Sequence, residues 1–493
     1  MTTTTPISGP RSYWIWVILA VFTAVKIPAL SVPLFWDEVG VYGAAGLYMH
    51  DHTLSMLPAS LPPELSRGHP LLYTFLQATW YTIFGDSVIG GHIGNLMISL
   101  MLMLSVWYII GKCITRRAAL IAVCLLAVQP IFFAQSVMVL PEVLLTLCML
   151  WALYFWTTNS YIGFAIFATL AILTKETAVI LPAVAIVHVL LTQKWRNRMS
   201  VRMVVGIIFP WLIFGLFLLI QKMQNGWYFF PYHGDNIKLV LPLMLDLLEK
   251  YARFIFIEQG RIVLSGICAL AIGIFLWNKQ FRIPHFLLLL LIWCTAGVAI
   301  NCISFYLDRY VLFVLVGGIL IASAFIDQLI SQHRAFLLCL PLGLIVGSVF
   351  MYGNPWEKRE PGLPNEEYFT YDSDMLYVSY AENMRQMIQE TIDAADTVQA
   401  YYANWPITSA LMDTRYGYTG KKIYTDFYMS PSWEKYLTIS GNKTLPVASA
   451  LIADPGAYNY VIPADSSWTP TRTIATRHHW FRQYTPNPEK TGN

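Results

Sequence analysis

Residues 13–38 read YWIWVILAVFTAVKIPALSVPLFWDE, an apolar run that ends in two adjacent carboxylates, Asp37 and Glu38. About 20 predominantly apolar residues are enough to cross the hydrocarbon core of a bilayer. The run from Tyr13 to Leu34 therefore predicts a first membrane span, and the two acids lie where the chain leaves it. Charges at that depth are costly without water or a partner, so the pair is either a solvated helix end or part of a functional site.

The composition indicates a membrane protein. Hydrophobic residues make up 56% of the 493 residues and charged residues 12%, about half the usual share in soluble domains. The net charge of +3 and the lack of a basic arm argue against nucleic-acid binding. The seven cysteines lie in or beside apolar runs, so they are expected to be buried side chains and not a disulfide framework or a metal cluster. The first span has no small-residue cleavage site and is expected to be retained.

Apolar runs continue to residue 352 and predict a mainly α, polytopic membrane protein of about 11 transmembrane helices. A shorter run, Leu71 to Phe84, suits an interfacial or re-entrant helix, and Leu239 to Ile257 is amphipathic. The predicted spans are Tyr13–Leu34, Val88–Ile110, Ala118–Phe133, Leu140–Trp156, Tyr161–Leu173, Thr177–Leu191, Met203–Ile220, Ile262–Trp277, Phe286–Phe305, Tyr310–Ile330 and Ala335–Tyr352.

Basic residues set the orientation. They cluster in the short loops after residues 111, 193, 278 and 331, which by the positive-inside rule face the cytoplasm. The loops that carry Asp37, Glu142, Lys175, His233 and Arg309 then all face the opposite side. The sequence thus predicts an integral protein of the cytoplasmic (inner or plasma) membrane, with its active site and C-terminal segment extracytoplasmic.

The composition changes after residue 352. Residues 353–493 hold no run long enough to cross a membrane and are rich in Tyr, Asp, Pro and Thr. Helical spacing from Asp374 to Asp396 and strand-like stretches at Val398–Tyr402 and Tyr460–Ile462 predict a mixed α/β unit. We therefore expect a transmembrane domain of residues 1–352 and a soluble extracytoplasmic domain of residues 353–493.

The outward loops hold acids, cations and aromatic rings. This set suits transfer of a group from a lipid-linked phosphate, because a carboxylate can accept the proton of an acceptor hydroxyl and cations can stabilise the phosphate that leaves. Aromatic rings can stack on sugars. The candidate catalytic residues are Asp37 and Glu38, and the candidate substrate-binding residues are His69, Glu142, Lys175, Glu176, Tyr232, His233, Arg309 and Tyr310.

Each candidate also has a structural explanation. Lys175 and Glu176 are adjacent and could pair with each other, while Arg309 could extend to the membrane surface from a span end. Glu142 follows Pro141 and could stabilise a helix N-terminus. His69 could cap a helix or fill the core, and the aromatic loop from Trp227 to His233 could be an interfacial belt.

In order along the chain, these motifs resemble those of the polytopic GT-C glycosyltransferases. The closest groups are the protein O-mannosyltransferases, the lipid A aminoarabinose transferases and the related lipid A galacturonosyl and mannosyl transferases. The resemblance covers roughly residues 10–330. It rests on Trp36-Asp37-Glu38, His69-Pro70-Leu71-Leu72-Tyr73, Pro141-Glu142-Val143-Leu144-Leu145, Leu173-Thr174-Lys175-Glu176 and Asp308-Arg309-Tyr310.

The resemblance implies that a sugar is taken from a dolichyl or undecaprenyl phosphate, on the extracytoplasmic face, with inversion at the anomeric carbon. It also implies that Asp37 is the base, with Glu38 beside it. His69 and Arg309 match residues near the phosphate, and Lys175 matches the basic residue of a Thr-Lys pair.

Two positions depart from the family pattern. Leu71 stands where a second proline is common. Gly68 stands where the aminoarabinose transferases carry an acid that can bind metal. We therefore assign no metal-ligating residues and no certain cofactor, and a divalent metal between His69 and His233 stays open.

The sequence thus predicts an inverting glycosyltransferase that moves a sugar from a polyprenyl-phosphate donor to a hydroxyl of a protein, lipid A or glycan. One alternative is a membrane transporter or flippase, for which midplane charges and repeated broken helices would be expected. Another is a polysaccharide polymerase or ligase that uses a lipid-diphosphate donor. The predicted partners are the donor, an acceptor and membrane lipids, with no nucleic acid.

Overall fold

The computed structural model describes residues 13–192, 200–237, 239–277, 284–303, 306–332, 375–390, 400–403, 407–420, 425–427, 447–453, 468–475 and 480–486. Within these ranges the chain is mainly helical. The predicted span Ala335–Tyr352 and the predicted boundary after residue 352 lie outside the described residues, as does the strand expected at Tyr460–Ile462.

Four described helical segments are long and apolar enough to cross a membrane: Tyr13–Ser31, Val88–Cys113, Val201–Asn225 and Asp308–Ser331. A fifth crossing exists if Leu241–Phe256 and Arg261–Ile274, which meet at 85°, count as one broken span. Four shorter apolar helices are also present, Glu142–Thr157, Tyr161–Thr174, Glu176–Leu191 and His285–Asn301. The chain is therefore an integral membrane protein, and the count of eleven spans stays a prediction.

The helix ends follow ordinary capping chemistry. Ser87, Thr115 and Ser200 accept hydrogen bonds from backbone N–H groups in the first turns of α6 (Val88–Cys113), α7 (Arg116–Ala127) and α12 (Val201–Asn225). Gly226 ends α12 in the left-handed region with φ +83°. The remaining helices of this part are α1 (Tyr13–Lys26), α8 (Pro130–Gln135), α9 (Glu142–Thr157), α10 (Tyr161–Thr174), α11 (Ile180–Leu191), α14 (Leu241–Phe256), α15 (Arg261–Trp277), α16 (His285–Asn301) and α17 (Leu312–Gln332).

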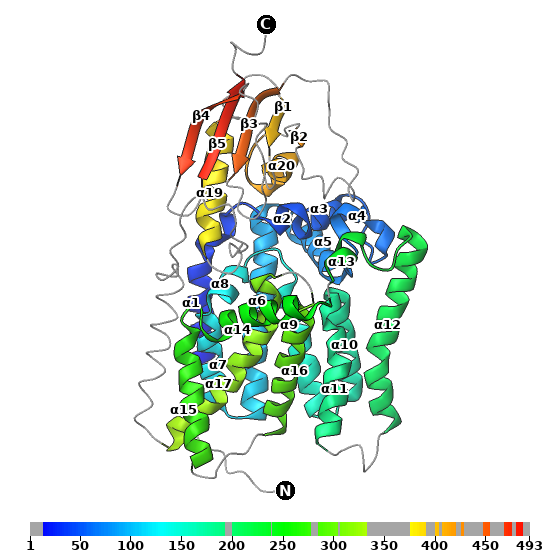
Figure 1. Cartoon of the computed structure of the whole chain (residues 1–493), viewed down its shortest axis with the longest axis vertical. Coiled ribbons are helices and arrows are strands. Elements are labelled where there is room, and N and C mark those ends of the chain that lie inside the picture. Colours follow the sequence, from blue (N-terminus) through cyan, green and yellow to red (C-terminus); the bar gives the residue numbers. More distant parts are fainter. Residues whose placement is uncertain are drawn as a thin grey trace.

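Short helices gather at one end of the long ones (Figure 1). They are α2 (Asp37–Gly40), α3 (Tyr42–Asp51), α4 (Pro63–Ser66), α5 (Leu72–Phe84) and α13 (Pro231–Asn236). The 3₁₀ turns η3 (Glu176–Val179) and η5 (Asp308–Val311) begin the segments that continue into α11 and α17. This layer carries most of the residues that the sequence analysis selected, and Glu142 lies at the start of α9.

Beyond the short helices, the same end holds the described part of the C-terminal segment (Figure 1). Its five strands pair in the order β2-β1-β3-β5-β4, with parallel pairs at β1 and antiparallel pairs at β5. The strands are β1 (Ala400–Ala403), β2 (Thr425–Phe427), β3 (Val447–Ala453), β4 (Trp468–Ala475) and β5 (Trp480–Pro486). The helices are α19 (Leu376–Ile388) and α20 (Ile407–Met412), and the 3₁₀ turn η8 spans Thr414–Tyr416.

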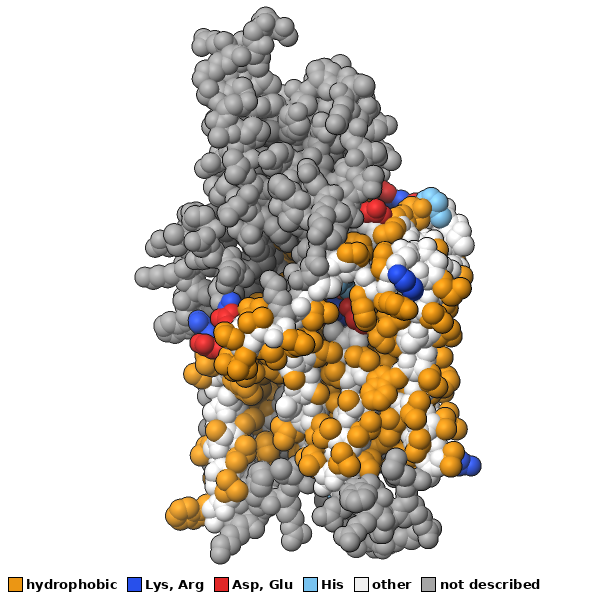
Figure 2. Space-filling model, turned by 45° about the vertical axis from the view of Figure 1, so that its right-hand side comes forward, with side chains coloured by type: hydrophobic (Ala, Val, Ile, Leu, Met, Phe, Trp, Pro, Cys, Tyr) orange, Lys and Arg blue, Asp and Glu red, His pale blue; other side chains and the backbone are white. Residues whose placement is uncertain are grey.

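Apolar side chains face outward along the long helices. Figure 2 shows them as a band over the helical part, with most charged side chains of that face at the edges of the band. Trp16, Leu212 and Val201 are 62, 64 and 79% exposed. Lipid tails can cover such a surface, whereas water would not favour it, so the band marks the part of the chain that lies in the bilayer.

Candidate active site

Asp37 lies at the start of α2, directly after a backbone turn in which Trp36 adopts φ 51°. Its carboxylate forms an ion pair with the guanidinium of Arg309, a residue 272 positions away at the start of the last described long helix. Burial alone raises the pKa of Asp37, but the charges of Arg309, Arg67 and Lys175 lower it more, so the pKa lies below its ordinary value. Asp37 is therefore ionised at neutral pH.

Glu142 joins a second cation to this pair. Its Oε1 accepts a hydrogen bond from Lys175 Nζ at 2.8 Å and lies 3.5 Å from Arg309 Nε. The Lys175 ammonium lies 3.7 Å from the centroid of the Tyr310 ring, a cation–π contact. Four segments far apart in sequence thus bring two carboxylates and two cations together, a group that we call the charge cluster (Asp37, Glu142, Lys175 and Arg309).

Lys175 and Glu176 do not form the mutual pair that the structural explanation offered. Glu176 instead accepts from His69 Nδ1 at 3.0 Å, and the His69 ring stacks on Tyr42 with centroids 6.0 Å apart. The extended backbone of Lys175 separates the two side chains at the end of α10, which sends one to each partner. His69 and Glu176 therefore form a second polar pair beside the charge cluster.

His233 lies next to that second pair. Its ring centroid is 4.9 Å from that of His69, so the two histidines meet as the sequence allowed. Burial and the adjacent His69 lower the pKa of His233 to about 3, which keeps its ring neutral at physiological pH. Tyr232 falls in α13, and its side chain lies outside what the structure describes.

Gly68 has a local reason. Its φ is +73°, and a Cβ there would lie 2.8 Å from the Trp227 ring and 3.1 Å from Phe230 Cβ. The aromatic loop packs against this glycine, so no acidic side chain fits where the aminoarabinose transferases carry one. This explains the departure noted from the sequence.

A metal finds no ready three-ligand site at this place. Among the described residues, His69, His233 and Glu176 are not a group whose ligand atoms all lie within 4.8 Å of one another, and His69 Nδ1 already faces Glu176. The donor types suit a metal such as zinc, so a divalent metal between His69 and His233 stays a prediction.

Glu38 has different partners from its neighbour Asp37. It is fully buried, its Oε2 accepts from the backbone N–H of Phe35 at 2.8 Å, and its Oε1 accepts from that of Val139 at 2.5 Å. His92 Nε2 lies 3.3 Å from the same Oε1. These contacts hold two loops together and leave the predicted catalytic role of Glu38 without geometric support.

Two residues near the site were not selected from the sequence. Arg67 is close enough to lower the pKa of Asp37, and Tyr42 packs its ring on His69 and, edge-on, on Tyr73. Arg67 was part of the motif that contains His69, so its place two residues before His69 was a usable signal. Tyr42 follows Glu38 by one helical turn within a run of small residues, which gave no such signal.

The membrane helices, the ordered motifs and the clustered acids and cations define the class: this chain has the fold of the polytopic GT-C glycosyltransferases, as the resemblance indicated. A family model described as Dolichyl-phosphate-mannose-protein mannosyltransferase matches residues 68–226. That match includes His69, Glu142, Lys175 and Glu176, whereas Asp37 and Arg309 lie outside it. No curated protein sequence matches the chain.

Solved structures agree on the fold. The apo crystal structure of ArnT from Cupriavidus metallidurans aligns with a TM-score of 0.61 at 15% identity, over 95% of this chain and 97% of that one. The ArnT structure bound to undecaprenyl phosphate aligns with a TM-score of 0.59 at 15% identity, over 96% and 98%. Both alignments cover so much of the chain that they reach into the C-terminal segment, beyond the residues 10–330 to which the motif resemblance applied.

Proposed function

We propose that this chain is an inverting glycosyltransferase that moves a sugar from a polyprenyl phosphate to an acceptor hydroxyl on the extracytoplasmic face of the cytoplasmic membrane. The observation that carries the proposal is the charge cluster, in which an ionised carboxylate lies against an arginine and a second carboxylate against that arginine and a lysine. The family description and the undecaprenyl phosphate in the ArnT structure support the choice of donor.

Asp37 acts as the general base. It takes the proton of the acceptor hydroxyl while that oxygen attacks the anomeric carbon of the donor. The bond between the anomeric carbon and the phosphate oxygen breaks, and its electron pair leaves with the polyprenyl phosphate. Attack from the face opposite the leaving group inverts the anomeric centre.

Arg309 and Lys175 stabilise the charge that grows on the departing phosphate. Both are nearly fully buried, so their charges act in surroundings where screening by water is weak. Arg309 already contacts two carboxylates, yet a guanidinium has five N–H donors in a fork and can serve a phosphate as well. The carboxylates hold the cations in place until the donor arrives.

The other predicted residues bind the sugar or the acceptor. Within the charge cluster, Glu142 Oε2 is buried and has no hydrogen-bond partner among the described residues, so it can accept from a hydroxyl of the sugar or the acceptor. The ring pair of His69 and His233 and the aromatic loop beside it offer faces on which a sugar can stack. We further propose that residues 353–493 form a separate domain that selects the acceptor. The transmembrane part would then comprise eleven spans.

Asp37→Asn tests the base. Membranes that hold the variant are incubated with labelled polyprenyl-phosphate sugars, and transferred label is counted. The loss of a general base lowers the rate about 10²–10⁴-fold. The matched control is Asp246→Asn on α14, where the carboxylate is half exposed and pairs with Lys250 one turn away.

The proposal is overturned if Asp37→Asn, inserted and folded, transfers at the wild-type rate. A product whose anomeric configuration equals that of the donor would refute the inverting step. Movement of intact lipid-linked sugar across the bilayer, with no polyprenyl phosphate released, would favour a flippase instead.

A further inference from the structure

The backbone just before Asp37 is held from the C-terminal segment. Tyr416 O accepts a hydrogen bond from the N–H of Leu34 at 3.0 Å. The next side chain, Phe35, is fully buried, and its ring centroid lies 5.8 Å from that of Tyr377 and 5.4 Å from that of Tyr380 on α19. The 3₁₀ turn η8 and helix α19, both more than 330 positions away in the sequence, thus contact the backbone and the side chain just before Asp37.

The turn that makes this contact is built for close approach. Gly417 has φ +88°, and a Cβ there would lie 3.0 Å from the Val88 side chain and 3.3 Å from Pro33 Cα. Asp413 accepts from the backbone N–H of Arg415 at 2.9 Å, which closes the turn. We call residues 413–418 the docking turn.

Arg415 fastens the docking turn to the membrane part. Its two terminal nitrogens donate to both oxygens of Asp51 at 2.9 and 2.7 Å, and one of them also donates to Asp86 at 3.0 Å. The same guanidinium donates to Asp413, which adds a partner within the turn. A planar fork that binds a carboxylate through two parallel bonds fixes position as well as contributing energy.

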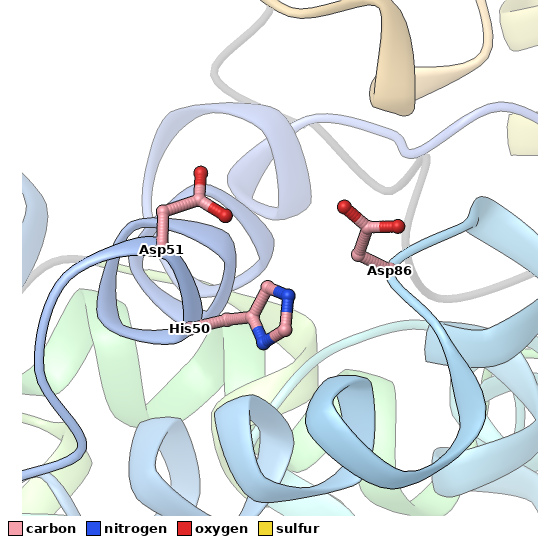
Figure 3. Close-up of side chains that lie close together, drawn as sticks. All are labelled: His50, Asp51 and Asp86. Carbon is pink, nitrogen blue, oxygen red and sulfur yellow. The ribbon is translucent and has the colours of Figure 1, made fainter.

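His50, Asp51 and Asp86 lie together at the end of α3 and in the loop before α6 (Figure 3). The three have the make-up of a cation site, because their ligand atoms all lie within 4.8 Å of one another. The two carboxylates, however, are already bound by the guanidinium of Arg415. A metal ion there would have to displace this guanidinium. The positive charge that balances the two carboxylates therefore comes from Arg415.

We propose that Arg415 is a positioning residue, which pins the docking turn so that the backbone at residues 33–36 presents Asp37 to Arg309. The catalytic consequence of this inference rests on the proposed function. The contact between the docking turn and the backbone before Asp37 can be measured whether or not the protein transfers a sugar. The Trp36 backbone, at φ 51°, is in a region that residues other than glycine rarely adopt and keeps only when the surroundings enforce it. Loss of the pin lets this backbone relax and moves the base.

The consequence falls on the rate and not on donor binding. Arg309 and Lys175 are expected to stay in place without Arg415, because both are held by the carboxylate of Glu142 inside the charge cluster. A misplacement of about 1 Å in a reacting group costs about 10²-fold in rate. We expect Arg415→Gln to lower kcat by about 10- to 100-fold and to leave KM for the donor within about twofold.

The experiment uses the full-length protein in membranes and in detergent. One readout is sugar transfer from labelled polyprenyl-phosphate sugar, analysed for kcat and KM separately. The other is hydrogen–deuterium exchange of the peptide that contains Leu34, whose N–H is bonded to the docking turn. Arg415→Gln removes the charged hydrogen bonds to Asp51 and Asp86 that hold the docking turn. We expect the loss of these bonds to make the peptide that contains Leu34 exchange about tenfold faster.

Three further variants complete the test. Asp51→Asn with Asp86→Asn removes the partners in the membrane part and leaves the turn itself intact, should Arg415→Gln fail to fold. Arg385→Gln is the matched control, because the ion pair of Arg385 is with Glu382 one turn away in the same helix, α19. Arg415→Lys keeps the charge without the fork and is expected to rescue kcat only in part.

Faster exchange with a lower kcat and an unchanged KM supports the pin. Unchanged exchange in both Arg415→Gln and the double Asn variant overturns it, as does a kcat equal to that of Arg385→Gln. If the wild-type protein transfers no sugar, the proposed function fails by itself. The exchange measurement then still decides whether Arg415 holds the backbone before Asp37.

Discussion

The pairing of Lys175 with Glu142 inside the charge cluster can be tested by a double-mutant cycle. Lys175→Met removes the ammonium, Glu142→Gln removes the carboxylate charge at equal size, and the double variant removes both. In the single variants a buried charge loses its closest partner, whereas in the double variant neither charge is present. The three variants should therefore differ far less than additively in their free energies of unfolding.

The distances give the size of the effect. Two unit charges 2.8 Å apart attract by about 6 kcal/mol at an effective dielectric constant of 20, before the cost of removing them from water is subtracted. Breaking such a pair from one side costs about 3–5 kcal/mol in measured cases. The cost of Lys175→Met should lie at the lower end of this range, because Glu142 keeps Arg309 as a partner at 3.5 Å. The cost of Glu142→Gln should lie higher, because Asp37 is then the one carboxylate of the charge cluster left for two cations.

The coupling energy should then be about 2–3 kcal/mol, which corresponds to roughly 30- to 150-fold in the unfolding equilibrium. It is measured by unfolding the purified protein with a denaturing detergent. The surface pair of Lys250 and Asp246 on α14 serves as the control. Its charges lie 3.0 Å apart, but the Asp246 side chain is 50% exposed, so its coupling should be only about 0.3–0.5 kcal/mol.

The reasoning is refuted if the two single changes at Lys175 and Glu142 add within about 0.5 kcal/mol, as independent sites do. Sugar transfer distinguishes the two parts of the argument. The double variant should recover stability but not activity, since the phosphate has lost one of its two cations. Recovery of activity together with stability would remove Lys175 from the proposed mechanism.

Two further predictions concern the first outward loop. Glu38→Gln should lower the free energy of unfolding by about 1–3 kcal/mol. The side-chain amide has one oxygen and one NH₂ group, so it can accept from the N–H of Phe35 or of Val139 but not from both. Thermal unfolding in detergent measures the loss of stability. If that variant is as stable as wild type, the structural role of Glu38 is wrong. The pKa of Asp37 is lowered in the folded chain, so its ion pair contributes stability fully above the ordinary carboxyl range near pH 4 and loses it as the pH falls through the folded pKa. The stability difference between wild type and Asp37→Asn should thus be constant from about pH 8 to 5 and shrink below about pH 4, and a change within the neutral range would contradict the assignment.

The sequence was informative where composition and order decide the structure. The helical segments begin and end close to the predicted runs, as with Leu71–Phe84 against α5 and Ile262–Trp277 against α15, because hydrophobic length and capping are local properties. Placing the basic loops on one side put the acids and cations of the site on the other. That step predicted that Asp37, Glu142, Lys175 and Arg309 could meet, and in the fold they do.

Partners within the site could not be predicted in this way. Lys175 and Glu176 are neighbours in the chain, yet an extended backbone sends them to different partners, and nothing local marks that conformation. The run Ala118–Phe133 was expected as one span and is divided into α7 and α8. Pro130 begins α8 because its fixed φ suits a first helical position and its missing N–H ends the preceding ladder.

The adjacent acids Asp37 and Glu38 illustrate why a motif alone leaves roles open. One of them faces Arg309 at the charge cluster, while the other binds two backbone N–H groups from separate loops and is closed off from solvent. An ionised base needs a fixed position, and a turn with a strained residue such as Trp36 does not hold itself. Glu38 closes that turn from within, at Phe35, and the docking turn holds it from outside, at Leu34. On this reasoning Glu38 fixes the position of the Asp37 carboxylate, and Arg415 supports the same position from the C-terminal segment.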